Sequence, residues 1–174
     1  MFDGRLFFTG QGFFTGEELY WYNGVDPPSI VVDLQPGPGG SSPLDLTPTP
    51  DYLFMSASSG IIGQELFALR AGGTSRDPPA APELVYDLVV GGSSNPRWLA
   101  YFDSKYLVFA ASSTNSGNPT LWILNITGNW SEGPTEIAGT VDGTFAPMFL
   151  IDGQSGVLYF SANDYDHGRE LWGW

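Results

Sequence analysis

The chain has 174 residues, which is enough for one domain of ordinary size with a core that needs no disulfide bridges. Hydrophobic residues make up 42% of it, which excludes wholesale disorder. The net charge of −13 excludes nucleic-acid binding and docking on anionic lipid, because both require clustered Lys and Arg, and the absence of cysteine excludes a thiolate zinc site and a cysteine nucleophile.

The first predicted element is a short apolar strand closed by a small residue, Leu6-Phe7-Phe8-Thr9, and it recurs three times. A second strand follows each copy, first as Glu18-Leu19-Tyr20. Both elements repeat roughly every 50 residues, and two independent markers with one rhythm indicate an internal repeat. The copies of the first element are residues 6–9, 53–56, 107–110 and 158–161, and those of the second are 18–20, 65–67, 120–122 and 170–172.

A third element, Val32-Asp33-Leu34, recurs at residues 86–88 and weakly near residues 137–139. A turn-rich stretch and a fourth apolar run then lead into the next unit. The runs are too short for helices, and Gly, Pro, Asn and Ser separate them, so we predict four strands in each unit and almost no helix.

Four strands in about 50 residues is the size of one propeller blade. A stacked β-solenoid usually has shorter coils, and a sandwich would not require a repeated sequence. We therefore predict an all-β fold, a β-propeller-like array of four-stranded antiparallel blades in one domain spanning residues 1–174. The predicted blades are residues 5–52, 53–105, 106–156 and a partial blade, 157–174.

Three and a half blades do not close a ring, and an open array would expose strand edges and apolar faces. The N-terminal residues 1–4 also resemble the end of a preceding blade, as seen at residues 148–153. We therefore expect this sequence to be a segment of a larger propeller. We expect other repeats of a longer chain, or other subunits, to cover its ends.

Two stretches carry a family resemblance. Residues 18–24 followed by Val32-Asp33-Leu34, and residues 158–164 followed by Gly168-Arg169-Glu170-Leu171-Trp172, resemble the tandem repeats with the signature Glu-Leu-Trp-x-x-Asp-Gly-Thr. That resemblance implies a large secreted or cell-surface protein with a propeller-like β fold, and it implies a scaffold, not a reaction. The sequence departs from the signature at Asn23, at the Pro-rich residues 77–82 and at Thr120, which replaces the Glu.

Candidate catalytic residues are few. The single histidine, His167, lies in a predicted loop, and no nucleophile motif accompanies it. A glycosidase would need two paired carboxylates, but Glu18, Glu65 and Glu170 share one phase of the repeat. Residues at equivalent positions of different blades behave as structural copies, so we expect these carboxylates to be structural and the protein not to be an enzyme.

Asp164, Asp166 and Glu170 are weak candidates for a calcium site, because they offer hard oxygen ligands within a short stretch. Their spacing fits no EF-hand loop, and the other units place Ser, Gly and Thr at the matching positions. An acidic β-hairpin is the favoured interpretation, and no cofactor is expected.

Two sequons, at Asn125 and Asn129, fall around a predicted exposed turn and are candidate N-glycosylation sites. Three tryptophans, Trp130, Trp172 and Trp174, are candidate interface residues, because bulky aromatic side chains favour the desolvated centres of interfaces.

The predicted function is therefore a structural or interaction scaffold within a larger extracellular or cell-surface assembly, with neither nucleic-acid binding nor membrane insertion. The alternative is a carbohydrate-binding, lectin-like propeller, because the chain is rich in aromatic residues that can contact sugars. A glycoside hydrolase is the third hypothesis.

Overall fold

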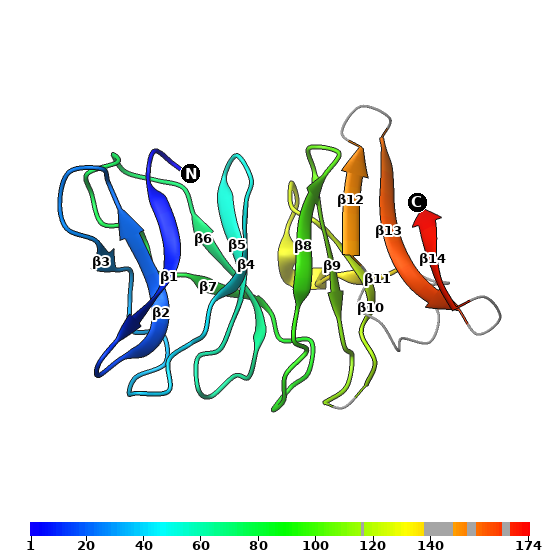
Figure 1. The fold of residues 1–174 in the computed structure, drawn as a ribbon, viewed down its shortest axis with the longest axis horizontal. Coiled ribbons are helices and arrows are strands. Elements are labelled where there is room, and N and C mark those ends of the chain that lie inside the picture. The colour runs from blue at the N-terminus through cyan, green and yellow to red at the C-terminus, as the bar shows by residue number, and fades with distance from the viewer. Residues whose placement is uncertain (116, 138–147, 153–155, 165–167) are drawn as a thin grey trace.

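The computed structural model describes residues 1–115, 117–137, 148–152, 156–164 and 168–174. In these residues 14 strands form four antiparallel sheets, and one 3-10 turn (Trp130–Glu132) is the only helical element. The sheets lie side by side in chain order along the long axis of the molecule (Figure 1). The prediction of an all-β, antiparallel fold is confirmed.

Sheets 1 and 4 have three strands each, and sheets 2 and 3 have four. Sheet 1 contains β1 (Leu6–Gly12), β2 (Gly16–Tyr22) and β3 (Ser29–Ile30). Sheet 2 contains β4 (Leu44–Pro48), β5 (Tyr52–Ala57), β6 (Glu65–Arg70) and β7 (Glu83–Tyr86). Sheet 3 contains β8 (Arg97–Phe102), β9 (Tyr106–Ala111), β10 (Thr120–Asn125) and β11 (Thr135–Glu136), and sheet 4 contains β12 (Met148–Asp152), β13 (Val157–Asp164) and β14 (Gly168–Gly173).

The sheets differ from the predicted blades by one strand. β4 falls within the predicted blade 5–52, yet it pairs with β5 of the following unit. A three-residue turn (49–51) joins β4 to β5, and a tight turn makes antiparallel neighbours of the strands that it joins. The longer connection, residues 31–43, is the one that crosses from sheet 1 to sheet 2. Sheets 2, 3 and 4 therefore each begin with the last strand of the preceding sequence unit.

The third repeated element is not a strand. β3 ends before the predicted segment 32–34, and β7 ends at Tyr86, the first residue of the predicted segment 86–88. Residues 31–34 and 87–88 lie outside strands. The backbone N–H groups of Leu34 and Leu88 donate to buried carboxylates instead of to a neighbouring strand. The weaker third copy, near residues 137–139, falls mostly outside the described residues.

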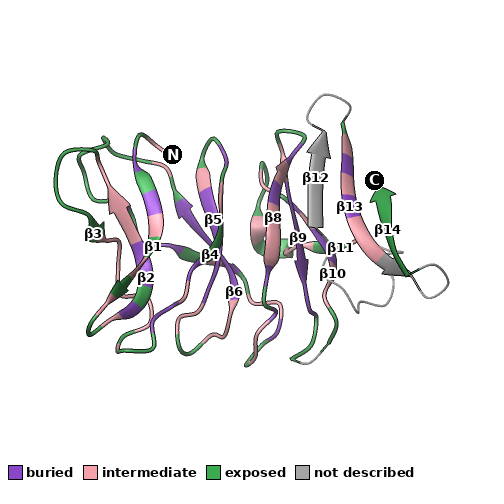
Figure 2. Cartoon of the chain, viewed as in Figure 1, coloured by how far each residue is buried: buried purple, intermediate pink, exposed green. Residues whose placement is uncertain are grey.

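The continuous apolar runs pack on both faces of their sheets. In β5, Leu53 and Met55 face sheet 1, while Phe54 between them faces sheet 3, as the period of two in a strand requires. Three buried clusters result, one at each contact between neighbouring sheets. Burial is greatest along β5, β6 and β9 in the middle of the row and least along β14 (Figure 2).

The first strands of successive sheets lie close together, β4 beside β8 and β8 beside β12. The Oγ1 of Thr47 donates to the carbonyl of Leu99 at 3.1 Å, and the backbone N–H of Trp98 donates to Asp45 Oδ2 at 2.8 Å. Both β4 and β8 carry an irregularity in register at the matching place, where Asp45 and Trp98 have positive φ angles of 55° and 52°. The two sheets therefore repeat one another down to their bulges. Within the described residues, no helix is long and apolar enough to cross a membrane.

Candidate functional site

The most distinctive buried group in sheet 1 is the carboxylate of Glu18 on β2, which is 0% exposed. Its oxygens accept hydrogen bonds from the backbone N–H groups of Leu34 and Gln35, both at 3.3 Å, and from that of Ser41 at 2.8 Å. The Ser41 hydroxyl donates to the same carboxylate. Glu18 thus holds the connection that crosses from sheet 1 to sheet 2.

Glu65 on β6 repeats this arrangement in sheet 2. It is also 0% exposed, and it accepts from the N–H of Leu88 at 3.2 Å, from the N–H of Ser94 at 2.7 Å and from the Ser94 hydroxyl. Burial raises the pKa of the Glu65 carboxyl above its ordinary value, against the opposing effect of these hydrogen bonds. We call each arrangement, Glu18 with Ser41 and Glu65 with Ser94, a glutamate–serine clasp.

Each clasp also reaches the following sheet. The carbonyl of Ser41 accepts a hydrogen bond at 2.9 Å from the N–H of Ser58, immediately after β5. The carbonyl of Ser94 accepts one at 2.8 Å from the N–H of Ser112, immediately after β9. One buried serine therefore binds the glutamate of its own sheet and the backbone of the next, which fixes the two sheets relative to each other.

The strand register shows that the glutamates occupy equivalent positions. Glu18 lies opposite Gly10, Glu65 opposite Ala57, and Glu170 opposite Ala162. The residue opposite each glutamate is therefore small in all three sheets. Glu170, unlike the other two, is exposed, and no described residue donates a hydrogen bond to its carboxylate.

Sheet 3 carries Thr120 at this position, opposite Ala111. The Thr120 hydroxyl is buried and has no hydrogen-bond partner among the described residues. The matching connection, residues 138–147, lies outside the described residues.

A second contact between sheets forms at the start of β1 in sheet 1 and of its counterpart β5 in sheet 2. Arg5, which is 1% exposed, donates to the carbonyls of Gly72 at 3.2 Å, Asp77 at 3.1 Å and Thr74, all in the connection between β6 and β7. It also pairs with Asp3. An arginine near the N-terminus thereby fastens the Pro-rich insertion of sheet 2 to sheet 1.

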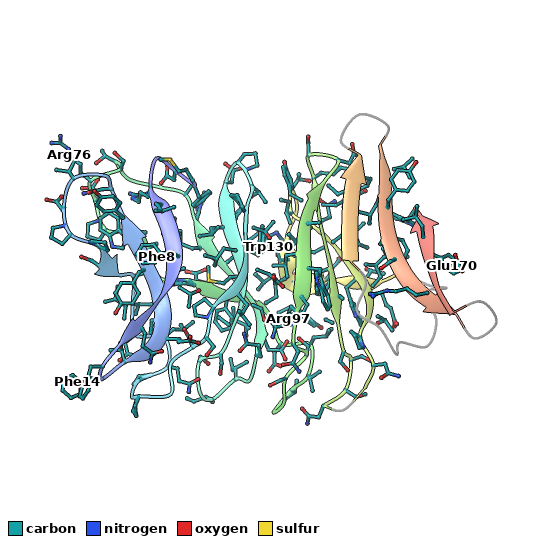
Figure 3. All side chains as sticks on the ribbon, in the orientation of Figure 1. Phe8, Phe14, Arg76, Arg97, Trp130 and Glu170 are labelled. Atoms are coloured by element: carbon teal, nitrogen blue, oxygen red, sulfur yellow. The ribbon has the colours of Figure 1, made fainter. Side chains whose placement is uncertain are left out.

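Tyr52 occupies the position in sheet 2 that Arg5 has in sheet 1, and it reaches the matching connection of sheet 3. Its ring lies 4.6 Å from that of Trp130, which also packs against Phe54 at 5.4 Å. Trp130, a candidate interface residue, is thus half-buried between sheets 2 and 3 of its own chain (Figure 3).

A groove of about 490 Å³ lies beside this contact. Tyr52 and Tyr101 provide aromatic rings, while Asp51 and Arg70 provide charged groups. A neighbouring hollow of about 440 Å³ shares Tyr52 and Arg70 and is also lined by Trp130. The combination of aromatic rings and hydrogen-bonding groups is the surface chemistry that sugars contact.

Of the three calcium candidates, the structure describes the side chain of Glu170 alone. Glu170 is exposed, Asp166 is outside the described residues, and Asp164 ends β13 with its side chain not described. In the described part of the chain, no three His, Cys, Asp or Glu side chains are grouped to hold a metal ion. His167 also lies outside the described residues.

Both sequon asparagines are exposed. The Oδ1 of Asn125 accepts from the N–H of Thr127 at 3.1 Å and from its hydroxyl at 2.8 Å. The Oδ1 of Asn129 caps the 3-10 turn by accepting from the N–H of Ser131 at 3.1 Å. Both side chains therefore lie on the surface in tight turns, where a glycan has room.

The other two candidate interface residues lie at the C-terminal end of the row. Trp172 is 38% exposed and Trp174 is 47% exposed. Trp172 Nε1 donates to the carbonyl of Ala162, and the ring of Trp174 lies 6.1 Å from that of Phe102. Much of both indoles remains uncovered within this chain.

No protein-family model matches the chain, and no curated protein sequence matches it.

The sequence indicated the glutamates through their shared phase, but it did not identify Ser41, Ser94 or Arg5. Ser41 and Ser94 lie in stretches rich in Gly and Ser, and the sequence predicts only turns there. The chain has only six Lys and Arg residues, and Arg5 is one that stands directly before an apolar strand, which is the signal that could have singled it out.

We predict that Glu65→Gln lowers the free energy of unfolding by about 1–3 kcal/mol, because the amide group leaves buried N–H and O–H donors without an acceptor. Ser94→Ala should lower it less, and the double variant should cost less than the sum of the two, since the residues share one interaction. Urea unfolding followed by circular dichroism measures each value. Glu136→Gln, at an exposed strand residue, is the matched control and should stay within about 0.5 kcal/mol of the natural chain.

The pKa of Glu65 predicts how this difference depends on pH. Because the folded-state pKa is raised above 4.5, the native state binds more protons than the unfolded state in that range, and stability from this group falls as pH rises through the folded pKa. The loss caused by Glu65→Gln should therefore be larger at pH 4 than at pH 7. Comparing the two chains at each pH cancels the effect of overall charge, and a penalty that grows with pH would contradict this prediction.

We further predict that Arg5→Lys destabilises the chain by about 2 kcal/mol, because an ammonium cannot serve several carbonyls in the plane of a guanidinium. Arg76→Lys is the matched control, since Arg76 is exposed in the same connection. Thermal unfolding distinguishes the two, and equal shifts for both variants would show that the Arg5 contacts contribute nothing specific.

Proposed function

We propose that this chain is a structural and interaction scaffold, a propeller-like array of sheets that forms part of a larger secreted or cell-surface assembly. The observation that carries the proposal is the clasp, because the repeated carboxylates Glu18 and Glu65 are fully buried and occupied by loop donors. Their role is to position one sheet on the next. Carboxylates used in this way are not available to a substrate. We therefore propose a scaffold that is not an enzyme. The glycoside hydrolase is the least supported of the three hypotheses.

The propeller-like arrangement is supported by three features. Successive sheets pack face to face, their first strands lie beside one another, and sheets 2 and 3 share the same irregularity in register. The resemblance to Glu-Leu-Trp-x-x-Asp-Gly-Thr repeats points to the same architecture and to a secreted or surface location. The exposed sequon turns at Asn125 and Asn129 are compatible with glycosylation there.

The involvement of further repeats or subunits is supported by the last sheet. Leu19, Leu66 and Leu121 occupy equivalent positions in sheets 1 to 3 and are 2%, 2% and 1% exposed. Leu171, their counterpart in sheet 4, is 65% exposed. An apolar position that is buried in every other sheet favours a covering neighbour in the functional protein.

A lectin-like propeller is the second candidate. The groove with Tyr52, Tyr101, Asp51 and Arg70 is the specific observation in its favour. Binding on a glycan array that Tyr101→Ala and Arg70→Ala abolish, without loss of stability, would establish this function.

The test of the scaffold function is the size of residues 1–174 in solution. We expect concentration-dependent association in sedimentation velocity, because the exposed face of sheet 4 is apolar and its edge strand is unpaired in the described structure. Acrylamide quenching, assigned with Trp172→Phe and Trp174→Phe, should show that association shields both indoles. A stable monomer at all concentrations, with both tryptophans accessible, would overturn the assembly proposal.

A further inference from the structure

The outer edge of sheet 4 presents an unfilled copy of the clasp. β14 is the last strand of the sheet in the described structure, whereas β6, the equivalent strand of sheet 2, pairs on that side with β7. Glu170 lies on β14 at the end of the row of sheets (Figure 3). Its carboxylate is exposed, while the equivalent carboxylates of Glu18 and Glu65 are 0% exposed.

The filled copies show what such an edge accepts. In sheet 2 the segment beyond β6 first pairs antiparallel with it, Leu66 opposite Tyr86 and Phe67 opposite Leu84. It then turns so that the N–H of Leu88 and both donors of Ser94 reach Glu65. The segment therefore supplies three things in order: a short strand, a free backbone N–H and a serine.

The charge of the edge favours the same occupant. A carboxylate in water loses its hydration when it is covered, and only a segment that brings several hydrogen-bond donors can compensate for that loss. An apolar surface alone would bury the charge of Glu170 without a partner. A strand without the following turn would pair with β14 but would not reach the carboxylate.

We propose that the edge of β14, with Glu170 and Leu171, is a binding site for a strand–loop segment supplied by another repeat of this kind. The segment adds a fourth strand to sheet 4, and its loop N–H groups and serine close a third clasp on Glu170. Strand addition provides affinity through the backbone, and the clasp provides specificity. This inference deepens the proposed scaffold function by naming the partner segment and the residue that selects it.

The chain itself provides the probe, because residues 83–96 form such a segment in sheet 2. A fluorescein-labelled peptide of residues 83–96 is titrated with the chain and followed by fluorescence anisotropy. We expect saturable binding that Glu170→Gln weakens by about tenfold or more, since a charge-assisted contact is lost. The same peptide with Ser94→Ala should bind the natural chain equally weakly and should lose nothing further against Glu170→Gln.

Two controls locate the binding. Glu136→Gln removes an exposed carboxylate from β11, the edge strand of sheet 3, and should leave the affinity unchanged. If the peptide instead displaced its own copy from sheet 2, Glu65→Gln would change the affinity and Glu170→Gln would not. That result, or binding insensitive to both residues, would overturn the proposal.

A fused chain removes the dependence on peptide affinity. Residues 70–96 are appended directly after Trp174, so that the copy follows β14 as it follows β6. We expect Trp172 to become protected from acrylamide, and Glu170→Gln in the fused chain to restore quenching. Unchanged accessibility of Trp172 in the fused chain would refute the binding site. Persistent self-association of residues 1–174 would then leave the scaffold proposal intact, so the two failures are distinguishable.

Discussion

The structure depends on buried carboxylates that have no basic partner. A carboxylate removed from water must recover its lost hydrogen bonds, and Glu18 and Glu65 do so only through backbone N–H groups and a serine from the connection to the next sheet. Such an interaction is demanding in its geometry, because each donor must point at one of two oxygens. The shape of the connection is therefore set by the carboxylate. Since the same serine binds the next sheet through its carbonyl, the position of that sheet follows as well.

The sequence predicted the part of the fold that follows from local pattern. The recurring runs beginning at Leu53 and Leu107 became β5 and β9, because strands covered on both faces must be apolar at every position. It did not predict which sheet β4 joins, since pairing depends on which of two connections is a tight turn. The strand predicted at Val32-Asp33-Leu34 is wrong, because the N–H of Leu34 donates to the carboxylate of Glu18, far away in the sequence, and not to a neighbouring strand. The donors Ser41 and Ser94 could not be selected from turns rich in serine, because their role depends on a contact across the sheet.

In the sequence of sheet 3, both halves of the clasp are replaced. Thr120 stands at the glutamate position there. In the other units the clasp serine comes two residues before a proline, as in Ser41-Ser42-Pro43 and Ser94-Asn95-Pro96. The matching residue of this unit, in Phe145-Ala146-Pro147, is a phenylalanine. A glutamate retained without its serine would leave a poorly paired charge in the interior, which costs more than the single unpaired hydroxyl that Thr120 has. Losing both halves is therefore the less costly change. This coupling between the glutamate and the serine explains why one unit of the repeat lacks both. It does so without assigning a catalytic role to any of the repeated glutamates.

The contacts at the start of β1 and of β5 differ from the clasps in an informative way. Arg5 and Tyr52 are equivalent in position, yet one is a cation bound to carbonyls and the other is an aromatic ring against Trp130. Each suits the connection that it meets, because the Pro-rich insertion presents carbonyls and the shorter connection in sheet 3 presents an indole. The clasps already join sheet 1 to sheet 2 and sheet 2 to sheet 3, so these outer contacts can differ in chemistry between the two junctions. Surface loops on a rigid framework can take on distinctive chemistry, and the groove beside Tyr52 lies at one of these outer contacts.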